Sequence, residues 1–567
     1  MYQYTSFDKV FVKQRAAQFR DQLERNLAGG LSDDDFRPLR LQNGWYVQRH
    51  APMLRVAVPY GELSSTQLRA LARIAREFDR GYGHFTTRQN LQYNWIPLVK
   101  SADVMEALAA VDMHGIQTSG NCIRNITSDC FAGVAADEII DPRPYCEILR
   151  QWSTLNPEFA FLPRKFKIAV TGAVEDRAAI AWHDIGLQLL KNEAGDIGFK
   201  VLVGGGMGRT PIVGTVIRDF LPWQQILVFI EAVVRVYNRY GRRDNMYKAR
   251  IKILVKAEGQ RFIDDVNDEF KNILERDIDG TEQIIPQAEF DRVAACFKLP
   301  EGVAPISGSA LHVPADAPAS FKRWTERNVH AHQIAGYRAV TLSLKRTGQA
   351  PGDATDSQME LAADLADKFS HGELRVSHDQ NLVLPWVKES DLFALWEAAR
   401  AASFATPNIG LLTDMIACPG GDFCALANAR SIPIAADLNA RFDDIDELYD
   451  IGDIDMHISG CINSCGHHHS GHIGILGVDK DGKEWYQVSL GGLDGSAISG
   501  NASTPGKVIG PSFSADEVAD VVEAVIDTYR AHRTTAAERF IDTVKRVGLD
   551  PFKTAANAQR RTTAQHA

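Results

Sequence analysis

The 567-residue sequence lacks an uninterrupted stretch of about 18 apolar residues, so no segment is typical of a transmembrane helix. Its first residues, MYQYTSFDKVFVKQR, lack the apolar core of a secretory signal peptide, and we expect a cytoplasmic protein that contacts no membrane. Positive charge does not dominate either, because the net charge is −10. That balance argues against general binding of nucleic acid.

Cysteine is also scarce, with eight residues in the chain, which excludes a small disulfide-dense scaffold. Four cysteines are scattered, and we expect them to behave as small buried hydrophobic residues: Cys122, Cys130, Cys146 and Cys296. The other four occur in two short motifs, CPGGDFC at residues 418–424 and CINSC at residues 461–465. Paired cysteines in a reducing compartment indicate a metal site.

An internal repeat organises the chain. Residues 53–98 read as a strand, a helix over 65–78 and a second strand, and the same order recurs from Tyr337. The motif QNL occupies the same place in both copies, at residues 89–91 and 380–382, which favours a duplication. The residue before it is Arg88 in the first copy and Asp379 in the second, so an anion site could persist in only one half.

A longer α/β stretch follows each repeat, with strands expected in FKIAVTG and GFKVLVGGGMGR and a long helix over residues 223–240. Residues 304–319 are rich in Pro, Ala, Ser and Gly, which is typical of a linker. The predicted organisation is an N-terminal extension, a repeat copy, a larger domain, the second copy, a second larger domain and a disordered tail. These span residues 1–50, 51–114, 115–318, 319–405, 406–553 and 554–567.

The spacing of the paired cysteines distinguishes two kinds of metal site. Structural zinc sites usually use C-x2-C knuckles, whereas these motifs are C-x5-C and C-x3-C, which suit a larger four-thiolate iron–sulfur cluster. The histidines after the second motif could supply nitrogen ligands, but the glycines beside them argue against a helix that would align them. We therefore expect His467, His468, His469 and His472 to be surroundings of the site or surface residues.

The pattern formed by Cys418, Cys424, Cys461 and Cys465 resembles the signature of the sirohaem-dependent sulfite and nitrite reductases, over nearly the whole chain. The resemblance implies an α+β fold with duplicated ferredoxin-like half-domains and two larger α/β domains that bind the cofactors, related by pseudo-two-fold symmetry. It implies that the four cysteines hold a [4Fe–4S] cluster and that Cys465 also ligates the sirohaem iron. Family members often have Pro and Gly where this chain has Ile462 and Ser464.

Sirohaem carries eight carboxylates and the substrate is an anion, so the site must be rich in cations. Matched motif by motif, the resemblance places four residues round the substrate: Arg55, Arg124, Lys165 and Lys167. It places Arg88 and Gln92 at the sirohaem carboxylates and the turn Gly204, Gly205 and Gly206 beside the cofactor. By itself that glycine run is a weak motif, since it lacks the context of a dinucleotide fingerprint. Crowding among cations should lower the pKa of both lysines, which suits proton donation.

The resemblance leaves the substrate open between sulfite and nitrite. The related nitrite reductases tend to have asparagine where this chain has Lys167, which favours sulfite and assimilatory sulfur metabolism, with nitrite as the alternative. No flavin or nicotinamide fingerprint is present, so the electron donor should be another protein, either a ferredoxin or a flavoprotein subunit. Two further alternatives are a zinc-stabilised binding protein and an iron–sulfur oxidoreductase without sirohaem.

Overall fold

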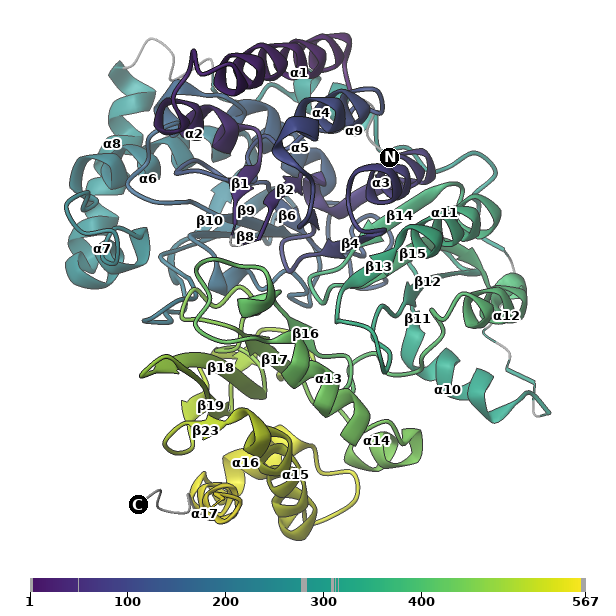
Figure 1. Cartoon of the computed structure of the whole chain (residues 1–567). Helices are drawn as coiled ribbons and strands as arrows, with labels where there is room; N and C mark the ends of the chain where they lie inside the picture. The colour runs from purple at the N-terminus through teal and green to yellow at the C-terminus, as the bar shows by residue number, and fades with distance from the viewer. Residues whose placement is uncertain are drawn as a thin grey trace.

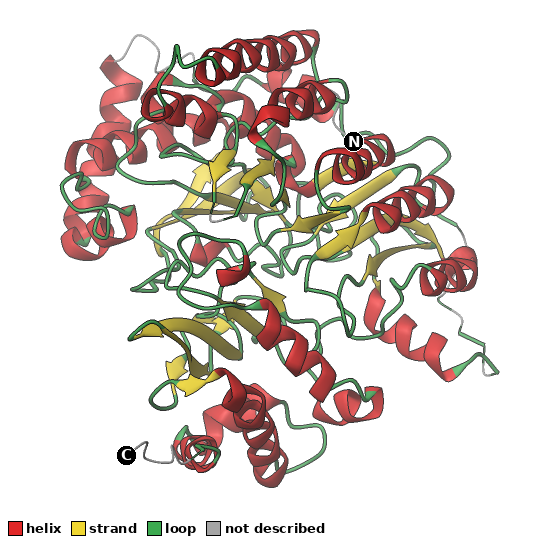
Figure 2. Ribbon diagram, viewed as in Figure 1, coloured by secondary structure: helices red, strands yellow, loops and turns green. Residues whose placement is uncertain are grey.

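The computed structural model describes residues 4–48, 50–276, 283–306, 311, 313–314 and 316–561. Helices and sheets are mixed throughout (Figures 1 and 2). Among the described residues, no helix is both long enough and apolar enough to cross a membrane. The expected linker lies between α9 (Gln287–Ala294) and α10 (Ala319–Asn328), and its residues 307–310, 312 and 315 fall outside the described part.

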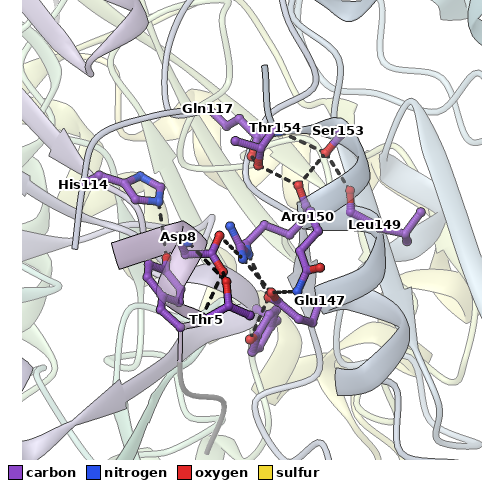
Figure 3. Close-up of polar contacts among 12 residues, drawn as sticks. Thr5, Asp8, His114, Gln117, Glu147, Leu149, Arg150, Ser153 and Thr154 are labelled. Atoms are coloured by element: carbon purple, nitrogen blue, oxygen red, sulfur yellow. Dashed lines mark hydrogen bonds and ion pairs between the residues drawn. The ribbon is translucent and has the colours of Figure 1, made fainter. Parts of the chain in front are cut away.

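The chain begins with two helices that cover the first half-domain, α1 (Ser6–Leu27) and α2 (Asp33–Gln42). Thr5 caps α1 in a capping box with Asp8, and Phe19 and Leu23 of α1 enter the same core as the first sheet. Farther along, a polar network joins the start of α1 to α5 (Arg143–Ser153), with Arg150 bonded to Glu147 at 2.6 Å and to Asp8 at 3.4 Å (Figure 3). The N-terminal segment is therefore anchored to the larger domain that follows.

The two repeats form two five-stranded sheets that exchange a strand with each other. The first sheet has the order β1-β2-β5-β4-β13 and the second β11-β12-β15-β14-β3. The strands of the first repeat are β1 (Trp45–Val47), β2 (Pro52–Val56), β3 (Glu62–Ser64), β4 (Tyr82–Phe85) and β5 (Leu91–Tyr93). Those of the second are β11 (Val329–His330), β12 (Tyr337–Leu342), β13 (Asp353–Thr355), β14 (Glu373–Val376) and β15 (Leu382–Lys388). Because β3 and β13 each cross to the other sheet, the two half-domains fold as one unit.

The helices of the repeats also correspond. The helix predicted over residues 65–78 is α3 (Ser65–Phe78), and its counterpart is α11 (Asp356–Phe369). Each begins with a capping box, formed by Ser64 and Gln67 in one copy and by Thr355 and Gln358 in the other. The two helices pack side by side and share one hydrophobic core with α4 (Ser101–Ala109) and α12 (Leu392–Ala401) (Figure 1).

Gln89 and Gln380, the first residues of the two QNL motifs, join the halves symmetrically. Both have a left-handed backbone, with φ of 58° and 60°. The Gln89 amide donates to the carbonyls of Ser128 and Val376, both at 2.9 Å. The Gln380 amide donates to those of Phe85 and Ala417, both at 3.0 Å. Each glutamine thus connects its own larger domain to the opposite repeat, which confirms the duplication and its pseudo-two-fold relation.

The two larger domains repeat one strand pattern. The first sheet has the order β10-β9-β8-β7-β6, with β6 (Thr127–Ser128), β7 (Ile168–Thr171), β8 (Ile185–Lys191), β9 (Ile197–Val203) and β10 (Thr215–Pro222). The second begins β16-β17-β18-β19, with β16 (Ile416–Ala417), β17 (Met456–Ser459), β18 (Ile473–Lys480) and β19 (Lys483–Leu490). In the first sheet β6 pairs with β7 and β7 with β8 in parallel, and β8 pairs with β9 antiparallel. The same holds for β16 with β17, β17 with β18, and β18 with β19.

Helices cover both of these sheets (Figure 2). The predicted long helix is α6 (Ile226–Tyr240), which a short 3₁₀ turn precedes. The first domain also contains α5, α7 (Ile251–Glu258), α8 (Gln260–Arg276) and α9. The helices of the second are α13 (Ile432–Arg441), α14 (Ile445–Ile451), α15 (Ala515–His532), α16 (Phe540–Val547) and α17 (Asp550–Ala558). The disorder expected after residue 553 is wrong for the start of that segment, because Phe552 and Ala556 bury α17 against α15; residues 562–567 lie outside the described part.

Candidate active site

Arg55 and Arg124 come from different domains and meet at one carbonyl. Arg55 lies on β2 and donates to the Thr118 oxygen at 3.3 Å, while Arg124 donates to the same oxygen at 2.7 Å. Arg124 also donates to the Gly120 carbonyl at 2.7 and 3.1 Å. The buried Arg55 Nε has no hydrogen-bond partner among the described residues. This pair of guanidinium groups therefore retains unused capacity to bind an anion.

Arg88 and Gln92 lie next to this pair but are engaged by the protein itself. Arg88 donates to the Asn125 carbonyl at 2.6 Å, and burial, with the charge of Arg124, lowers the pKa of Arg88 to about 9. Gln92 accepts from Arg55 at 3.0 Å and donates to Asn94 at 2.8 Å. The geometry thus gives Gln92 a part in orienting Arg55, a role that the sequence pattern did not indicate.

Lys165 and Lys167 flank Phe166, which forms a single parallel bridge with Ile123. The strand expected over the lysines is therefore wrong in its bounds, because regular pairing begins at Ile168, although the alternation survives, with Phe166 buried in the core. Among the described residues, neither ammonium group has a hydrogen bond or an ion pair.

The pKa values of both lysines are lowered, as the sequence predicted, but the main cause differs. Burial comes first, followed by neighbouring cations, and the pKa of Lys165 falls to about 8. That of Lys167 lies well below its ordinary value because of burial and the charges of Lys165 and Arg88. The two lysines therefore lie in a desolvated group of cations, and neither ammonium group is paired with a carboxylate of the described residues.

Two cations that the sequence reading missed complete the cluster. Arg250 donates to the Asp184 carboxylate at 2.7 and 2.9 Å, and Asp184 also accepts from the Lys167 backbone N–H at 2.9 Å. Lys252 is buried and donates to the Met207 and Thr210 carbonyls at 2.7 and 2.6 Å. Arg250 is the N-cap of the helix over Ile251–Glu258 and Lys252 is its second residue, so the basic run KARIK at the start of this helix was the available signal.

The glycine run at residues 204–206 forms a tight turn after β9. Gly204 has a φ of +85°, and a Cβ at Gly205 would lie 2.3 Å from the Ala181 carbonyl oxygen. The N–H groups of Gly204 and Gly206 donate to carbonyls of the protein, at 3.0 and 2.8 Å. The glycines hence allow a close backbone approach, and the contact of these amides with a cofactor stays a prediction.

The four paired cysteines follow the parallel strands β16 and β17, whose carboxyl ends lie at one edge of the second large sheet. Cys418 Sγ accepts from the Gly460 N–H at 3.2 Å, and the exposed Cys465 ends the second motif. Burial raises the pKa of Cys418 to about 12 and also raises those of Cys424 and Cys461. Thiolates there need positive charge such as iron supplies.

The turn between Cys461 and Cys465 has serine in a left-handed backbone conformation, where the resemblance led us to expect glycine in many family members. Ser464 has a φ of +55°, and its buried hydroxyl bonds to His468 Nδ1 at 3.0 Å. His467, His468 and His472 are buried rather than at the surface, which corrects one half of the expectation, and His467 and His468 both bond to Ser464 of the turn. Of the scattered cysteines, Cys130 and Cys146 are buried as expected, whereas Cys122 and Cys296 are half-buried.

Cys465 connects the cysteine motif to the cations. The Thr87 hydroxyl, one residue before Arg88, donates to the Cys465 carbonyl at 2.9 Å. Electrostatic coupling to Cys465 partly opposes the lowering of the pKa values of Lys165 and Lys167, and it also affects the pKa values of the other three cysteines. The structure thus brings the predicted cluster ligands and the predicted substrate residues into one site.

Comparison with known proteins agrees with this geometry. The sequence matches the "Nitrite and sulphite reductase 4Fe-4S domain" over residues 119–274 and 411–563, and the "Nitrite/Sulfite reductase ferredoxin-like half domain" over residues 46–111 and 333–402. The fold is similar to that of the NirA protein of Mycobacterium tuberculosis, with a TM-score of 0.75 at 24% identity over 96% of this chain and 97% of that one.

Curated relatives include both kinds of reductase. "Sulfite reductase [ferredoxin] 1" of Mycolicibacterium paratuberculosis is 26% identical over 87% of this chain and 82% of its own length. The "Assimilatory ferredoxin-dependent nitrite reductase" of Haloferax mediterranei is 28% identical over 88% of this chain and 82% of its own length. The cofactors that the resemblance implied, sirohaem and a [4Fe–4S] cluster, are those of this group. The chain is an oxidoreductase that belongs to the nitrite and sulphite reductase family.

Proposed function

We propose that this enzyme reduces sulfite to sulfide in six electron steps, in assimilatory sulfur metabolism. The observation that carries the choice of anion is Lys167, which adds a second ammonium beside Lys165 at a position where related nitrite reductases tend to have asparagine. Sulfite carries more negative charge than nitrite, so a second cation balances it better. Nitrite is the second candidate, because nitrite reductases are among the relatives at similar identity.

The residues present fit the two cofactors. Sirohaem is a polycarboxylate, and the site offers half-buried cations that include an unpartnered guanidinium Nε on Arg55. In this proposal Arg88, with the turn at residues 204–206, holds sirohaem, and the four cysteines hold the cluster. Gln92 contributes by holding Arg55. When bound, the two groups would supply single electrons and an iron that binds the substrate, with Cys465 as the shared ligand.

The protein's own side chains would supply binding and protons. Arg55 and Arg124 bind the anion. The Thr118 carbonyl holds both guanidinium groups in place, so their remaining donors are preorganised before the substrate binds. Lys165 and Lys167 are the proposed acids nearest the substrate, because their lowered pKa values favour the release of a proton to an oxygen that leaves as water. Each water molecule formed requires two protons, so both lysine side chains must take up new protons from solvent during turnover.

The proposed electron donor is a ferredoxin. The chain has no flavin or nicotinamide fingerprint, and relatives named as sulfite or nitrite reductases include ferredoxin-dependent enzymes. A flavoprotein donor is the alternative, and turnover with each reduced donor distinguishes them.

The test is turnover of sulfite and nitrite by the purified enzyme with reduced ferredoxin, with Lys167→Asn alongside. We expect a higher kcat/KM for sulfite, and a shift of the sulfite-to-nitrite ratio toward nitrite of about tenfold or more in the variant. An unchanged ratio contradicts the specificity role of Lys167, and a wild-type preference for nitrite contradicts sulfite as the substrate. The absorption spectrum of each preparation checks that the sirohaem content is equal.

A further inference from the structure

A cavity of about 690 Å³ lies between the two halves of the molecule, and its lining residues do not include Arg55, Arg124, Lys165 or Lys167. Both halves contribute to its walls, with Phe131 and Arg177 from the first and His378 from the second. We call it the acidic pocket after five of its residues: Asp379, Asp414, Asp453, Asp455 and Asp494.

The acidic pocket is the pseudo-two-fold counterpart of the proposed active site. Thr127 pairs with Ala169 in the first large sheet as Ile416 pairs with His457 in the second, so Ala169 and His457 are equivalent. Two residues earlier stand Lys167 and Asp455, and four earlier Lys165 and Asp453. The QNL motifs make Arg88 and Asp379 equivalent as well. At three positions, therefore, a cation of one site is replaced by a carboxylate in the other.

The cluster ligands have no counterparts in the acidic pocket. Eight residues beyond the equivalent pair Ala169 and His457 lie Arg177 and Cys465, and the register of β6 and β16 likewise relates Asp129 to Cys418. Arg177 bonds to Asp129 at 2.9 Å and to Asp137 at 2.7 Å. Ion pairs thus occupy the place of a cluster, and the acidic charge would repel a polycarboxylate.

Most carboxylates of the pocket are neutralised within the protein. Arg327 pairs with Asp453 at 2.6 Å, Lys345 with Asp414 at 3.3 Å and His457 with Asp455 at 2.7 Å. Two carboxylates have no cationic partner among the described residues. Asp494 accepts hydrogen bonds from Ser496, whereas Asp379 has no hydrogen bond or ion pair and is exposed to the cavity.

Two acceptor atoms of residues that line the acidic pocket also have no hydrogen-bond donor. His378 is 9% exposed, and its Nδ1 lies 3.0 Å from the Thr87 carbonyl, to which it must donate. Burial lowers the His378 pKa, which favours a neutral ring with Nε2 as an acceptor. This atom has no donor in hydrogen-bond geometry among the described residues, and the ring also interacts with the Ser128 backbone. Oδ2 of Asp455 is also buried without a partner. Buried acceptors without donors are costly, and a ligand with N–H groups would satisfy them.

We propose that the acidic pocket binds an organic cation that carries primary ammonium groups, with Asp379 as the counter-charge and His378 Nε2 as an acceptor. A metal ion is a poorer occupant, because the described residues contain no group of three or more suitable side chains arranged to hold one. The site is distinct from the cation cluster, so the proposal does not depend on which anion the enzyme reduces.

The test is isothermal titration calorimetry of the purified holoenzyme at pH 8 with putrescine, and with 1,4-butanediol as the uncharged analogue. We expect saturable binding of putrescine, none of butanediol, and no competition from sulfite. The nearly isosteric Asp379→Asn should weaken putrescine at least about tenfold, while Asp219→Asn, an exposed carboxylate on β10 outside the pocket, should leave it unchanged.

Four results would overturn the proposal. They are the absence of putrescine binding at millimolar concentration, equal binding of butanediol, an unchanged affinity in Asp379→Asn, or stoichiometric displacement of putrescine by Mg²⁺ or Ca²⁺. The comparison of putrescine with butanediol uses the unaltered enzyme, so it decides the question even if a variant fails to fold. The sirohaem absorption and the Tm of each variant check its integrity.

Discussion

Arg55 and Arg124 donate to the same acceptor, the Thr118 carbonyl, at 3.3 and 2.7 Å, although 69 positions separate them in sequence. The segment that carries Thr118 is supported from α5, where the Gln117 side chain donates to Ser153 at 3.0 Å and accepts from Thr154 at 2.9 Å (Figure 3). The shared acceptor thus fixes the distance between the two guanidinium groups, and an anion that bridges them needs this distance to be fixed.

Replacing Arg124 by lysine should weaken sulfite turnover, because one ammonium group cannot keep the bonds to both Thr118 and Gly120 and still meet the anion. We expect kcat/KM to fall ~100-fold. Steady-state kinetics measure this, with Arg243→Lys as a control on an exposed arginine. Equal losses in the two variants would contradict a specific role for Arg124.

The pH dependence of kcat/KM should report Lys165. A group whose pKa is lowered to about 8 is protonated below that value and loses its proton above it, so activity should decline as the pH rises through about 8. In Lys165→Arg the guanidinium stays charged, and we expect this decline to move to higher pH while kcat falls through poorer proton donation. A decline at the same pH in both proteins would assign it to another group.

Cys424→Ser should lose the iron–sulfur cluster, since each of the four proposed ligands binds one iron. Cys122→Ser is the matched control, because Cys122 is also half-buried and near the cations, and its thiol donates to the Ser119 carbonyl at 3.2 Å. Acid-labile sulfide and iron content measure the outcome. A full cluster in Cys424→Ser, or its loss from both variants, would refute the assignment.

His457 and Asp455 make a pH-dependent contribution to stability. Burial alone would lower the His457 pKa, but the Asp455 carboxylate at 2.7 Å raises it to about 9. The stabilisation should be complete below about pH 6.5 and disappear as the pH rises through 9, because the unfolded histidine is already neutral there. We expect His457→Gln to lose roughly 2–3 kcal/mol at pH 6 and little at pH 9.5, measured by urea denaturation. A loss independent of pH would indicate packing alone.

The ion pair of Arg150 with Glu147 is nearly inaccessible to solvent, with side chains 4% and 0% exposed. Arg150→Met leaves that carboxylate buried without its cation and should cost about 3–5 kcal/mol of unfolding free energy. The control Arg25→Met removes the exposed pair with Asp21 and should cost less than about 0.5 kcal/mol. Adding Glu147→Gln to Arg150→Met should recover part of the loss; a further additive loss would contradict the charge argument.

Much of the site could be predicted from sequence because it depends on short-range spacing. The two cysteine motifs and the alternation of Lys165 and Lys167 predicted residues that the fold brings close together. The helix over residues 65–78 has the predicted bounds because its capping box and apolar stripe are local. The repeated QNL likewise located the equivalent left-handed turns at Gln89 and Gln380.

Only the tertiary structure decided which distant groups meet and which become buried. Sequence gave no indication that β3 and β13 exchange sheets, that Arg250 and Lys252 join the cations, or that Gln92 holds Arg55. The sequence showed that Asp379 stands in the second copy where Arg88 stands in the first, but the acidic pocket forms only when the second half folds against the first. The physical reason is that hydrogen-bond partners and desolvation depend on packing between segments far apart in the chain, whereas motif spacing reports only neighbours along it.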